Sequence, residues 1–489
     1  MIYNQLVEST ASFSDRTAIV DKNRVFKYSH LLNAIQEMSI FLGKETAKPG
    51  KTIAIQIRNS LEFVISFYSA VKTGTNILLL DSSLKPEEIQ NYLKLTESIF
   101  LLCQPTADKE NGYNPVFKYS IPFVFVPEIK TEDTNYISKN YSSKNNKKSS
   151  VFYLLSSGST GIPKIIVRST EQTLSVINIF NNTLPYNEED RVMALLPFTH
   201  SFGFLNVLLS TLSCGATLYI ESFSPRSTAN KIKEHGITVL PATPFIFRML
   251  NETTFQNKPD FSSLRIAISA GSSLPLAISD KFKQKFGLSI FQSYGTTETG
   301  PASLACFEDS IQKPGWVGKP YKGVAFDVLD ADGNHMPLGS EGLIAVKSPA
   351  NTSGYLNNPE ANSEIFRKDF ILTGDTGSQD EMENIFIRGR ERPMINVAGK
   401  KVSPAEVETC IRNHGQVTDV LVVGEKLPNG NEIVKAFVVS SGDITTLELR
   451  EFCTKTMADF KVPRSIEFVK NLSQGSMGKR IYRIPNQIV

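Results

Sequence analysis

The sequence predicts an α/β protein, with a large N-terminal part built on parallel sheets, then a β-rich subdomain, and a small α+β domain at the C-terminus. Three observations lead to this prediction. The chain has 489 residues, which is too long for one hydrophobic core and indicates two or more domains. Apolar runs alternate with amphipathic stretches over most of the length, as in βαβ units. The pattern then changes twice, after Gly315 and after Arg390.

The N-terminal part shows the alternation of strands and helices most clearly. Thr52–Ile57 and Asn76–Leu80 are predicted strands, and the apolar spacing of Ser60–Lys72 and Pro86–Leu95 predicts a helix after each of them. Ser263–Ser269 is predicted to be a buried strand that ends in a run of small residues. Strands that alternate with helices in this way favour parallel sheets covered by helices.

The two later parts have different patterns. After Gly315, short strands are predicted at Ala325–Leu329 and Gly342–Val346, with a turn at Asp332–Asn334 between them, and this predicts the β-rich subdomain. Beyond Arg390 the pattern predicts two helices and two strands, at Pro404–His414, Val417–Val423, Glu432–Val439 and Leu447–Ala458. The expected domains are therefore residues 1–390 and 391–489, and the second has an ordinary domain size.

Composition and charge exclude several classes of function. The formal net charge of +3 shows no basic excess, so no nucleic-acid partner is expected. The five cysteines are scattered without a C-x-x-C pair, which argues against a disulfide framework or a zinc site and fits reduced thiols. The N-terminus lacks the pattern of a signal peptide. Residues 192–220 carry no charge, but polar residues and Pro197 interrupt them, so we expect a buried helix with polar loops rather than a membrane span, in a soluble cytoplasmic protein.

Small hydroxyl residues and glycines follow a predicted strand at Tyr153–Leu155. A loop of this kind can bring backbone N–H groups and hydroxyls close to phosphate oxygens, although the composition alone also fits a plain flexible turn. It is not a Walker A loop, because no G-x-x-x-x-G-K-[ST] occurs in the chain. The residues predicted to bind phosphate are Ser156, Ser157, Gly158, Ser159, Thr160, Gly161 and Lys164.

The segment Tyr153–Lys164 closely resembles the phosphate loop of the adenylate-forming superfamily, which includes acyl-CoA synthetases, nonribosomal peptide adenylation domains and firefly luciferase. Four further segments match in the family's order, and the resemblance covers essentially the whole chain: Gln292–Glu298, Thr373–Asp375, Gly389–Arg390 with Val402–Glu408, and Gly478–Lys479. The resemblance implies two doubly wound α/β subdomains and a β-rich subdomain in the N-terminal AMP-binding domain, followed by a mobile C-terminal domain.

The resemblance also implies how ATP is held at its phosphates. Ser157, Thr160 and Lys164 would hold the β- and γ-phosphates, and Thr297 would donate to the α-phosphate. Glu298 would be the metal ligand for a Mg²⁺ ion, a hard cation suited to carboxylate oxygen. Taken singly, Glu298 also fits an ordinary surface pair.

The nucleoside would be held by other segments of the same set. Tyr294 would lie along the adenine ring, Asp375 would accept hydrogen bonds from the ribose hydroxyls, and Arg390 would touch the same sugar. Taken singly, Asp375 also fits a role in capping a turn. The remaining members of the nucleotide site in this set are Gln292, Gly295 and Thr296.

The C-terminal domain is implied to carry the catalytic lysine and the hinge. Lys479 would reach the α-phosphate and the carboxylate of the acid, neutralising charge as the new bond forms. Arg392 occupies the place of the hinge residue. Asn396 departs from the family, where many members have Lys, and this puts the details of the thioester step in doubt. Residues 399–402 would form the loop that faces the incoming thiol.

Residues 197–204 match the segment that opens the acid pocket of the family. Members that activate amino acids carry an Asp where this chain has Ser201, so a buried substrate ammonium would lack a partner. Together with nearby small residues, Phe202 and Phe204 favour an apolar fatty or aromatic acid. His200 would be a catalytic-site residue that gates the pocket, unless it is a packed core histidine. The small residues are Gly271, Gly295, Gly300 and Ala302.

The sequence therefore predicts an enzyme that uses ATP and Mg²⁺ to join a small-molecule carboxylic acid to AMP and then passes the acyl group to a thiol, most simply that of coenzyme A. One alternative is a ligase that loads the phosphopantetheine of an acyl or peptidyl carrier protein. An alternative of another class is a non-catalytic nucleotide-binding relative, against which the retained Lys479, Glu298 and Asp375 argue.

Overall fold

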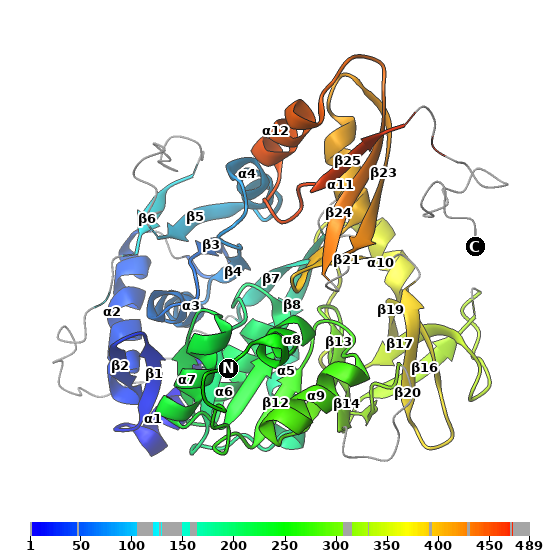
Figure 1. Cartoon of the computed structure of the whole chain (residues 1–489). Helices are drawn as coiled ribbons and strands as arrows, with labels where there is room; N and C mark the ends of the chain where they lie inside the picture. Colours follow the sequence, from blue (N-terminus) through cyan, green and yellow to red (C-terminus); the bar gives the residue numbers. More distant parts are fainter. Residues whose placement is uncertain are drawn as a thin grey trace. The chain divides into compact units, whose positions relative to one another are not determined.

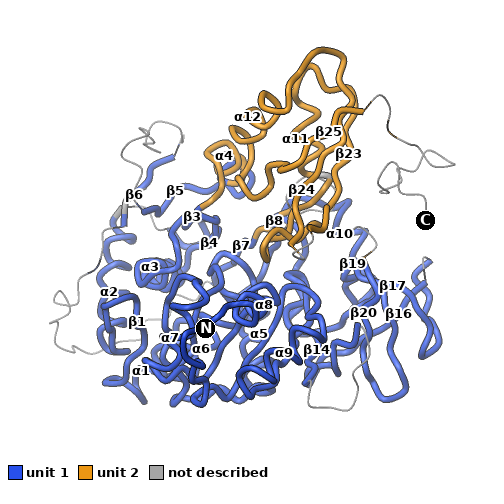
Figure 2. Tube along the Cα trace, in the orientation of Figure 1, with its two compact units in different colours: residues 1–82, 93–154, 165–389 blue, residues 83–92, 155–164, 390–489 orange. Residues whose placement is uncertain are grey.

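The computed structural model of the protein divides into two units (Figure 2). Unit 1 consists of residues 1–82, 93–154 and 165–389, and unit 2 of residues 83–92, 155–164 and 390–489. The residues that the structure describes are 2–45, 48–104, 121–126, 129, 149–156, 164–306, 315–330, 332–390, 394–427, 431–469 and 472.

The first large sheet of unit 1 has nine strands, and its pairing is parallel from β13 through β1 (Figure 1). Antiparallel strands complete both edges. In order across the sheet, the strands are β15 (Lys319–Pro320), β14 (Gly300–Cys306), β13 (Ile290–Thr296), β12 (Ile266–Ser269), β11 (Val239–Ala242), β9 (Arg191–Ala194), β10 (Thr217–Ile220), β1 (Thr17–Asp21) and β2 (Arg24–Lys27).

The second sheet has six strands and lies almost wholly in unit 1. Its strands from β6 to β7 pair in parallel, as expected for strands connected by helices. The order is β6 (Phe123–Phe125), β5 (Ser98–Cys103), β3 (Thr52–Gln56), β4 (Asn76–Leu79), β7 (Val151–Ser156) and β8 (Lys164–Ser169). The prediction of two α/β subdomains with largely parallel sheets is confirmed.

The third sheet of unit 1 is the predicted β-rich subdomain. Its strands pair in an antiparallel manner. The strands are β16 (Ala325–Leu329), β17 (Gly342–Lys347), β19 (Phe370–Gln379) and β18 (Phe366–Arg367), with β20 (Ile385–Arg390) paired to β19.

Local sequence signals explain where the helices begin and end. Ser60 caps α3 by accepting a hydrogen bond from the Phe63 N–H, and Gly74 ends it with a left-handed φ of 74°. Residues 61–70 of α3 are all buried, so this helix lies inside the unit. The helices are α1 (Ile2–Phe13), α2 (Tyr28–Glu45), α3 (Leu61–Thr73), α4 (Pro86–Leu95), α5 (Thr170–Thr183), η3 (Phe202–Leu209), α6 (Ser210–Ser213), α7 (Pro225–His235), α8 (Pro244–Glu252), α9 (Leu276–Phe286) and α10 (Pro359–Ile365).

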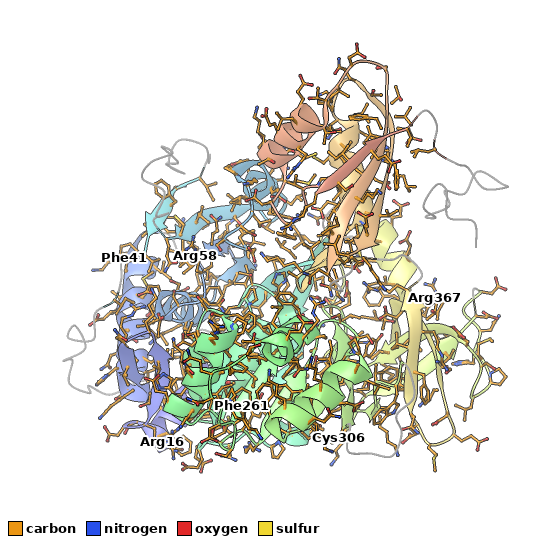
Figure 3. All side chains as sticks on the ribbon, in the orientation of Figure 1. Arg16, Phe41, Arg58, Phe261, Cys306 and Arg367 are labelled. Atoms are coloured by element: carbon orange, nitrogen blue, oxygen red, sulfur yellow. The ribbon has the colours of Figure 1, made fainter. Side chains whose placement is uncertain are left out.

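Two clusters of buried apolar side chains fill unit 1. The larger one joins α3, η3 and the six-stranded sheet, where the Phe67 and Phe204 rings meet edge to face at 4.9 Å. The smaller one lies around α8 and α9, and Phe261, which Figure 3 labels, stacks on Phe286 there at 4.4 Å. The cores hold the sheets rigidly enough to position side chains at the strand ends.

Unit 2 has a separate core and the predicted α+β composition. The strands are β21 (Ile395–Val397), β22 (Lys400–Val402), β23 (Val417–Lys426), β24 (Glu432–Ser440) and β25 (Ser465–Phe468), and the helices are α11 (Pro404–Arg412) and α12 (Thr446–Thr456). The predicted helix Pro404–His414 ends two residues early, at Arg412. Residues 83–92, which include the first part of α4, also belong to this unit.

The predicted elements agree with the structure with small shifts at their ends. The strand predicted at Ser263–Ser269 begins only at Ile266, because residues 262–265 form a turn and a bend before it. The uncharged stretch 192–220 contains β9, η3, α6 and β10, of which η3 is a buried π-helix. Among the described residues, we find no helix with the length and apolar character needed to cross a bilayer. All five cysteines are free thiols.

Candidate active site

The hairpin of β13 and β14 presents the predicted Tyr294–Glu298 segment. The strands pair up to Thr296 and Gly300, with a bulge between Tyr294 and Gly295. A Cβ atom at Gly295 would lie 2.1 Å from the Gly300 carbonyl oxygen, so only glycine fits there. Thr299 closes the turn, since its hydroxyl accepts from the Thr296 N–H at 3.1 Å. Thr297 and Glu298 therefore lie at the tip of a tightly fixed turn.

Tyr294 and Asp375 are brought together from two different sheets. The Tyr294 hydroxyl donates a hydrogen bond of 2.7 Å to Asp375 Oδ2. Asp375 lies on β19 and is 7% exposed, and its N–H donates to the Thr373 hydroxyl at 3.1 Å. The carboxylate thus accepts a hydrogen bond from a side chain of another sheet. This arrangement places an aromatic ring beside a carboxylate, as a nucleoside site needs. Gln292, in the same strand, is buried.

Glu298 is held by the segment 350–355, which follows β17. The Tyr355 hydroxyl donates to Glu298 Oε1 at 2.8 Å, and the Thr352 N–H donates to the Glu298 carbonyl at 2.8 Å. The same segment forms a bridge with β8 through Ile166 and Tyr355. Glu298 is therefore fixed within unit 1 and is not one half of a surface ion pair in the part of the chain that the structure describes.

Arg168 lies directly behind this turn and was not predicted as a site residue. It is fully buried in β8, and its guanidinium donates to the carbonyl oxygens of Ala350, Thr297 and Glu298, the second at 2.6 Å and the third at 3.4 Å. Burial lowers the pKa of Arg168 to about 10, partly opposed by the Glu298 charge, so the group remains a cation at neutral pH. A charged residue directly after the apolar run Ile165–Val167 was the sequence signal that could have identified it.

His200 lies next to Asp81 at the entrance to η3. His200 Nε2 is 3.7 Å from Asp81 Oδ2, to which the Thr199 hydroxyl also donates at 3.3 Å. The imidazole is 50% exposed, so His200 is not a packed core histidine. The Ser201 and Thr297 hydroxyl oxygens are 3.4 Å apart, which connects the predicted pocket segment to the predicted phosphate contact.

The predicted acid-pocket residues have different degrees of burial. Phe204 is fully buried, whereas Phe202 is partly buried. Gly271 has a φ of +90°, and a Cβ atom there would approach only the Thr243 methyl group, at 3.9 Å. Gly203 packs so closely that a Cβ atom would lie 2.2 Å from the Pro197 carbonyl oxygen.

Several predicted site residues belong to unit 2 or lie outside the described residues. Ser156 ends β7, Lys164 begins β8 and is buried, and Arg390 ends β20; all three belong to unit 2. The residues outside the described part are Ser157, Gly158, Ser159, Thr160, Gly161, the hinge candidate Arg392 and the catalytic candidate Lys479.

Asn396 has a local structural role in unit 2. Its Oδ1 accepts a hydrogen bond from the Gly399 N–H at 2.8 Å, which closes the turn between β21 and β22. Ala398 and Gly399 both have positive φ in this turn, at 51° and 90°. Lys400, in the predicted thiol-facing loop, lies over the Phe460 ring at 4.4 Å. A lysine at position 396 would lack the acceptor that this turn uses.

The donors at the site fit a magnesium ion carried by a nucleotide. No group of three acidic, histidine or cysteine side chains that could hold a metal by itself occurs among the described residues. Glu298 offers one carboxylate oxygen beyond the one that accepts from Tyr355. Mg²⁺ is commonly bound by one or two carboxylates together with substrate phosphates, which is compatible with a single glutamate.

Comparison with known proteins gives one consistent answer. The sequence profile of the AMP-binding enzyme family matches residues 6–356, and that of the AMP-binding enzyme C-terminal domain matches residues 406–479. The chain is 26% identical to a 4-coumarate–CoA ligase of Pinus taeda, over 98% of this chain and 93% of that protein. It is 28% identical to an oxalate–CoA ligase of Arabidopsis thaliana, over 99% of this chain and 97% of that protein.

A solved structure shares the fold over almost its whole length. The o-succinylbenzoate CoA synthetase of Bacillus subtilis superposes with a TM-score of 0.86, at 23% sequence identity, covering 98% of this chain and 97% of that one. With the profile match across more than half of the chain, and the hairpin and strand positions described above, the protein belongs to the family of AMP-binding, adenylate-forming enzymes.

Proposed function

We propose that this protein is an AMP-forming acid–CoA ligase that activates a fatty or aromatic carboxylic acid. In the first step a carboxylate oxygen bonds to the α-phosphorus of ATP while the bond to pyrophosphate breaks. In the second step the sulfur of coenzyme A bonds to the acyl carbon, AMP leaves and the thiol proton is released. The observation that carries this proposal is the β13–β14 hairpin, which presents Tyr294, Thr297 and Glu298 and joins Tyr294 to Asp375 of β19 by a hydrogen bond.

The proposed roles follow from the chemistry of these side chains. Asp375 accepts hydrogen bonds from the ribose, and Tyr294 presents its ring to the adenine. Thr297 donates to the α-phosphate, close to Ser201 at the pocket entrance. When bound, a Mg²⁺ ion would neutralise phosphate charge, and Glu298 is the residue that would hold it. Lys479 is proposed to stabilise the charge that develops at the α-phosphate.

The proposed acid class rests on the pocket segment. Ser201 stands where a carboxylate would be needed to bind a substrate ammonium, which disfavours α-amino acids. Phe202, Phe204 and the open space at Gly271 suit an apolar chain or ring. The named relatives act on different acids, so the acid must be found by experiment.

Acid-dependent exchange of labelled pyrophosphate into ATP tests the first step. We expect exchange with a fatty or aromatic acid, and none with α-amino acids or oxalate, across a panel of purified acids. Lys479→Ala should lower the exchange rate by at least about 100-fold and leave ATP binding largely intact, because loss of one transition-state charge contact costs several kcal/mol. Lys455→Ala, which removes an exposed lysine of α12, is the matched control. Wild-type exchange in Lys479→Ala would remove Lys479 from the mechanism.

The second step separates the possible acceptors. We expect acyl-CoA to form when free coenzyme A is added after adenylation. A chain that transfers the acyl group only to a holo-carrier protein would instead be a carrier-loading ligase. A chain that binds ATP and supports no exchange with any acid would be a non-catalytic relative, which would reject the proposal.

A further inference from the structure

The guanidinium of Arg168 joins three sheets of unit 1 at one point. Arg168 belongs to β8 of the six-stranded sheet, and its carbonyl acceptors at Thr297 and Glu298 belong to the β13–β14 turn of the nine-stranded sheet. Its third acceptor, the Ala350 carbonyl, follows β17 of the five-stranded sheet. Within the described residues, Arg168 forms no ion pair, and its Nε is buried without a hydrogen-bond partner. An arginine kept only to bind strands together would more often be matched by a carboxylate.

The segment 350–355 reaches the same glutamate from the other side. Its backbone is tied to β8 by hydrogen bonds from the Val167 N–H to the Gly354 carbonyl at 2.9 Å and from the Thr352 hydroxyl to the Val167 carbonyl at 2.6 Å. From this support, Thr352 donates to the Glu298 carbonyl and Tyr355 donates to Glu298 Oε1, both at 2.8 Å. The main chain and one carboxylate oxygen of Glu298 are therefore both fixed, and Oε2 has no hydrogen-bond partner among the described residues.

We propose that Arg168 and Tyr355 are positioning residues that present the second carboxylate oxygen of Glu298 to the divalent cation of the nucleotide. Arg168 fixes the main chain of the Thr297–Glu298 turn, and Tyr355 fixes the carboxylate plane by occupying Oε1. Loss of either contact would let the carboxylate leave the single orientation that it has in this structure, so both contacts favour cation binding. The proposal rests on the role given to Glu298 in the proposed function.

Tyr355→Phe is the most direct test, because it removes the hydroxyl and keeps the ring. We measure binding of Mn²⁺ to the protein with ATP by electron paramagnetic resonance, and the Mg²⁺ concentration that gives half-maximal pyrophosphate exchange. The dissociation constant for Mn²⁺ and the half-maximal Mg²⁺ concentration should each rise about tenfold, as expected for loss of a hydrogen bond to a charged group. Binding of ATP in the presence of EDTA should be unchanged.

Tyr321→Phe is the matched control. Tyr321 is also a buried tyrosine of unit 1, and its hydroxyl donates to the Ser293 hydroxyl at 3.0 Å, away from Glu298. This variant should bind Mn²⁺ as the wild type does. Equal Mn²⁺ binding by Tyr355→Phe and the wild type would overturn the role of Tyr355.

Arg168 is tested by a graded pair of substitutions. Arg168→Met should weaken Mn²⁺ binding by more than tenfold, because it releases all three carbonyls, and Arg168→Lys should recover part of the affinity by restoring one charged donor. Circular dichroism and the melting temperature show whether each variant is folded. If Arg168→Met does not fold, Arg168→Lys decides the question. A folded Arg168→Met with wild-type Mn²⁺ affinity would overturn the proposal, and so would wild-type affinity in Arg168→Lys if only that variant folds.

The two proposals fail in different ways. A wild-type protein without acid-dependent exchange would reject the proposed function, while its Mn²⁺ affinity in the presence of ATP could still be compared with that of the variants. Normal exchange in the wild type together with unchanged Mn²⁺ binding in the variants would reject only the positioning role.

Discussion

Two arginines of unit 1 are held in contrasting ways. Arg265 lies on the rim of the nine-stranded sheet, where its Nε donates to Asp190 Oδ1 at 2.7 Å and its side chain is 36% exposed. Arg168 is fully buried, and its acceptors are main-chain carbonyl oxygens. The hydrogen bonds that Arg265 donates to the Asp190 carboxylate raise the pKa of Arg265, whereas burial lowers the pKa of Arg168 to about 10.

The difference indicates what each arginine contributes. A cation paired with a carboxylate has its charge neutralised, so the pair near Asp190 should contribute mainly to stability. Burying a cation whose acceptors are carbonyl oxygens lowers the free energy of unfolding, because no opposite charge compensates for the lost hydration. Its position beside Thr297 and Glu298 indicates that Arg168 contributes by holding the main chain of that turn in place. Substitutions in the nucleotide region should therefore change ligand binding, and those around Asp190 should change stability.

Among substitutions in the nucleotide region, Asp375→Ala should have the largest effect on ATP binding. Loss of hydrogen bonds from the carboxylate to the ribose should weaken ATP binding about 100-fold, since each such charge-assisted bond contributes about 1.5–3 kcal/mol. Isothermal titration calorimetry measures this directly. Asp369→Ala, which removes an exposed carboxylate just before β19, should bind ATP normally. Equal ATP affinity in both variants would contradict the assignment of Asp375.

Among substitutions around Asp190, Asp190→Ala should have the largest effect on the stability of the protein. It removes acceptors for Arg265, for the Thr238 hydroxyl and for the Asn187 N–H. We expect the free energy of unfolding to fall by about 2 kcal/mol, a modest figure because Arg265 is partly exposed to solvent. The rate of pyrophosphate exchange per folded molecule should be unchanged. Thermal unfolding measures the first quantity. The neighbouring Glu189→Ala is the control, because it breaks an exposed pair with Arg16 and should leave the melting temperature nearly unchanged.

The pH dependence of the same site sharpens the comparison. Burial alone would raise the pKa of Asp190, but hydrogen bonds from Arg265, Thr238 and Asn187 bring it below its ordinary value. The carboxylate therefore contributes stability that is present above the unfolded pKa of about 3.9 and is lost as the pH falls through the lower folded pKa. The difference in melting temperature between wild type and Asp190→Asn should be constant near neutrality and shrink below about pH 4. A melting-temperature difference that grows as the pH falls would contradict the lowered pKa of Asp190.

Tyr321→Phe should give the smallest effect. It removes one hydrogen bond beneath β13 and leaves the buried Ser293 hydroxyl without that donor, at a cost of about 1 kcal/mol. The melting temperature should fall slightly while ATP affinity stays the same. A large loss of ATP affinity would mean that ATP binding depends on the packing of Tyr321 against β13 more than on the Thr297–Glu298 turn.

The sequence predicted the fold class and most element positions because local signals are strong at these places. The strand, helix, strand and helix from Thr52 to Leu95 were all predicted, and caps such as Ser60 and Gly74 fix their ends. The early end of α11 and the late start of β12 were missed, and the residues next to them form turns and bends. The π-helical form of η3 has no periodicity of its own that would distinguish it from an α-helix over eight residues.

The candidate site was only partly predictable for a physical reason. Tyr294, Thr297, Glu298 and Asp375 lie in recognisable segments, and the structure brings Tyr294 to Asp375 as a hydrogen-bonded pair. Arg168 acts on main-chain carbonyl oxygens, which every residue has, so no pattern of partner residues could reveal it. Tyr355 likewise reaches Glu298 from 57 positions away, after three sheets have folded together.

The close packing at Gly203 limits how this enzyme can be re-engineered. A methyl group at position 203 would collide with the Pro197 carbonyl oxygen, which lies in the segment just before His200. Relief of that collision would shift the start of η3 and with it the neighbouring His200 and Ser201. A mutant library that seeks a different acid should therefore randomise position 202 and keep glycine at position 203, and also at position 271, where φ is +90°.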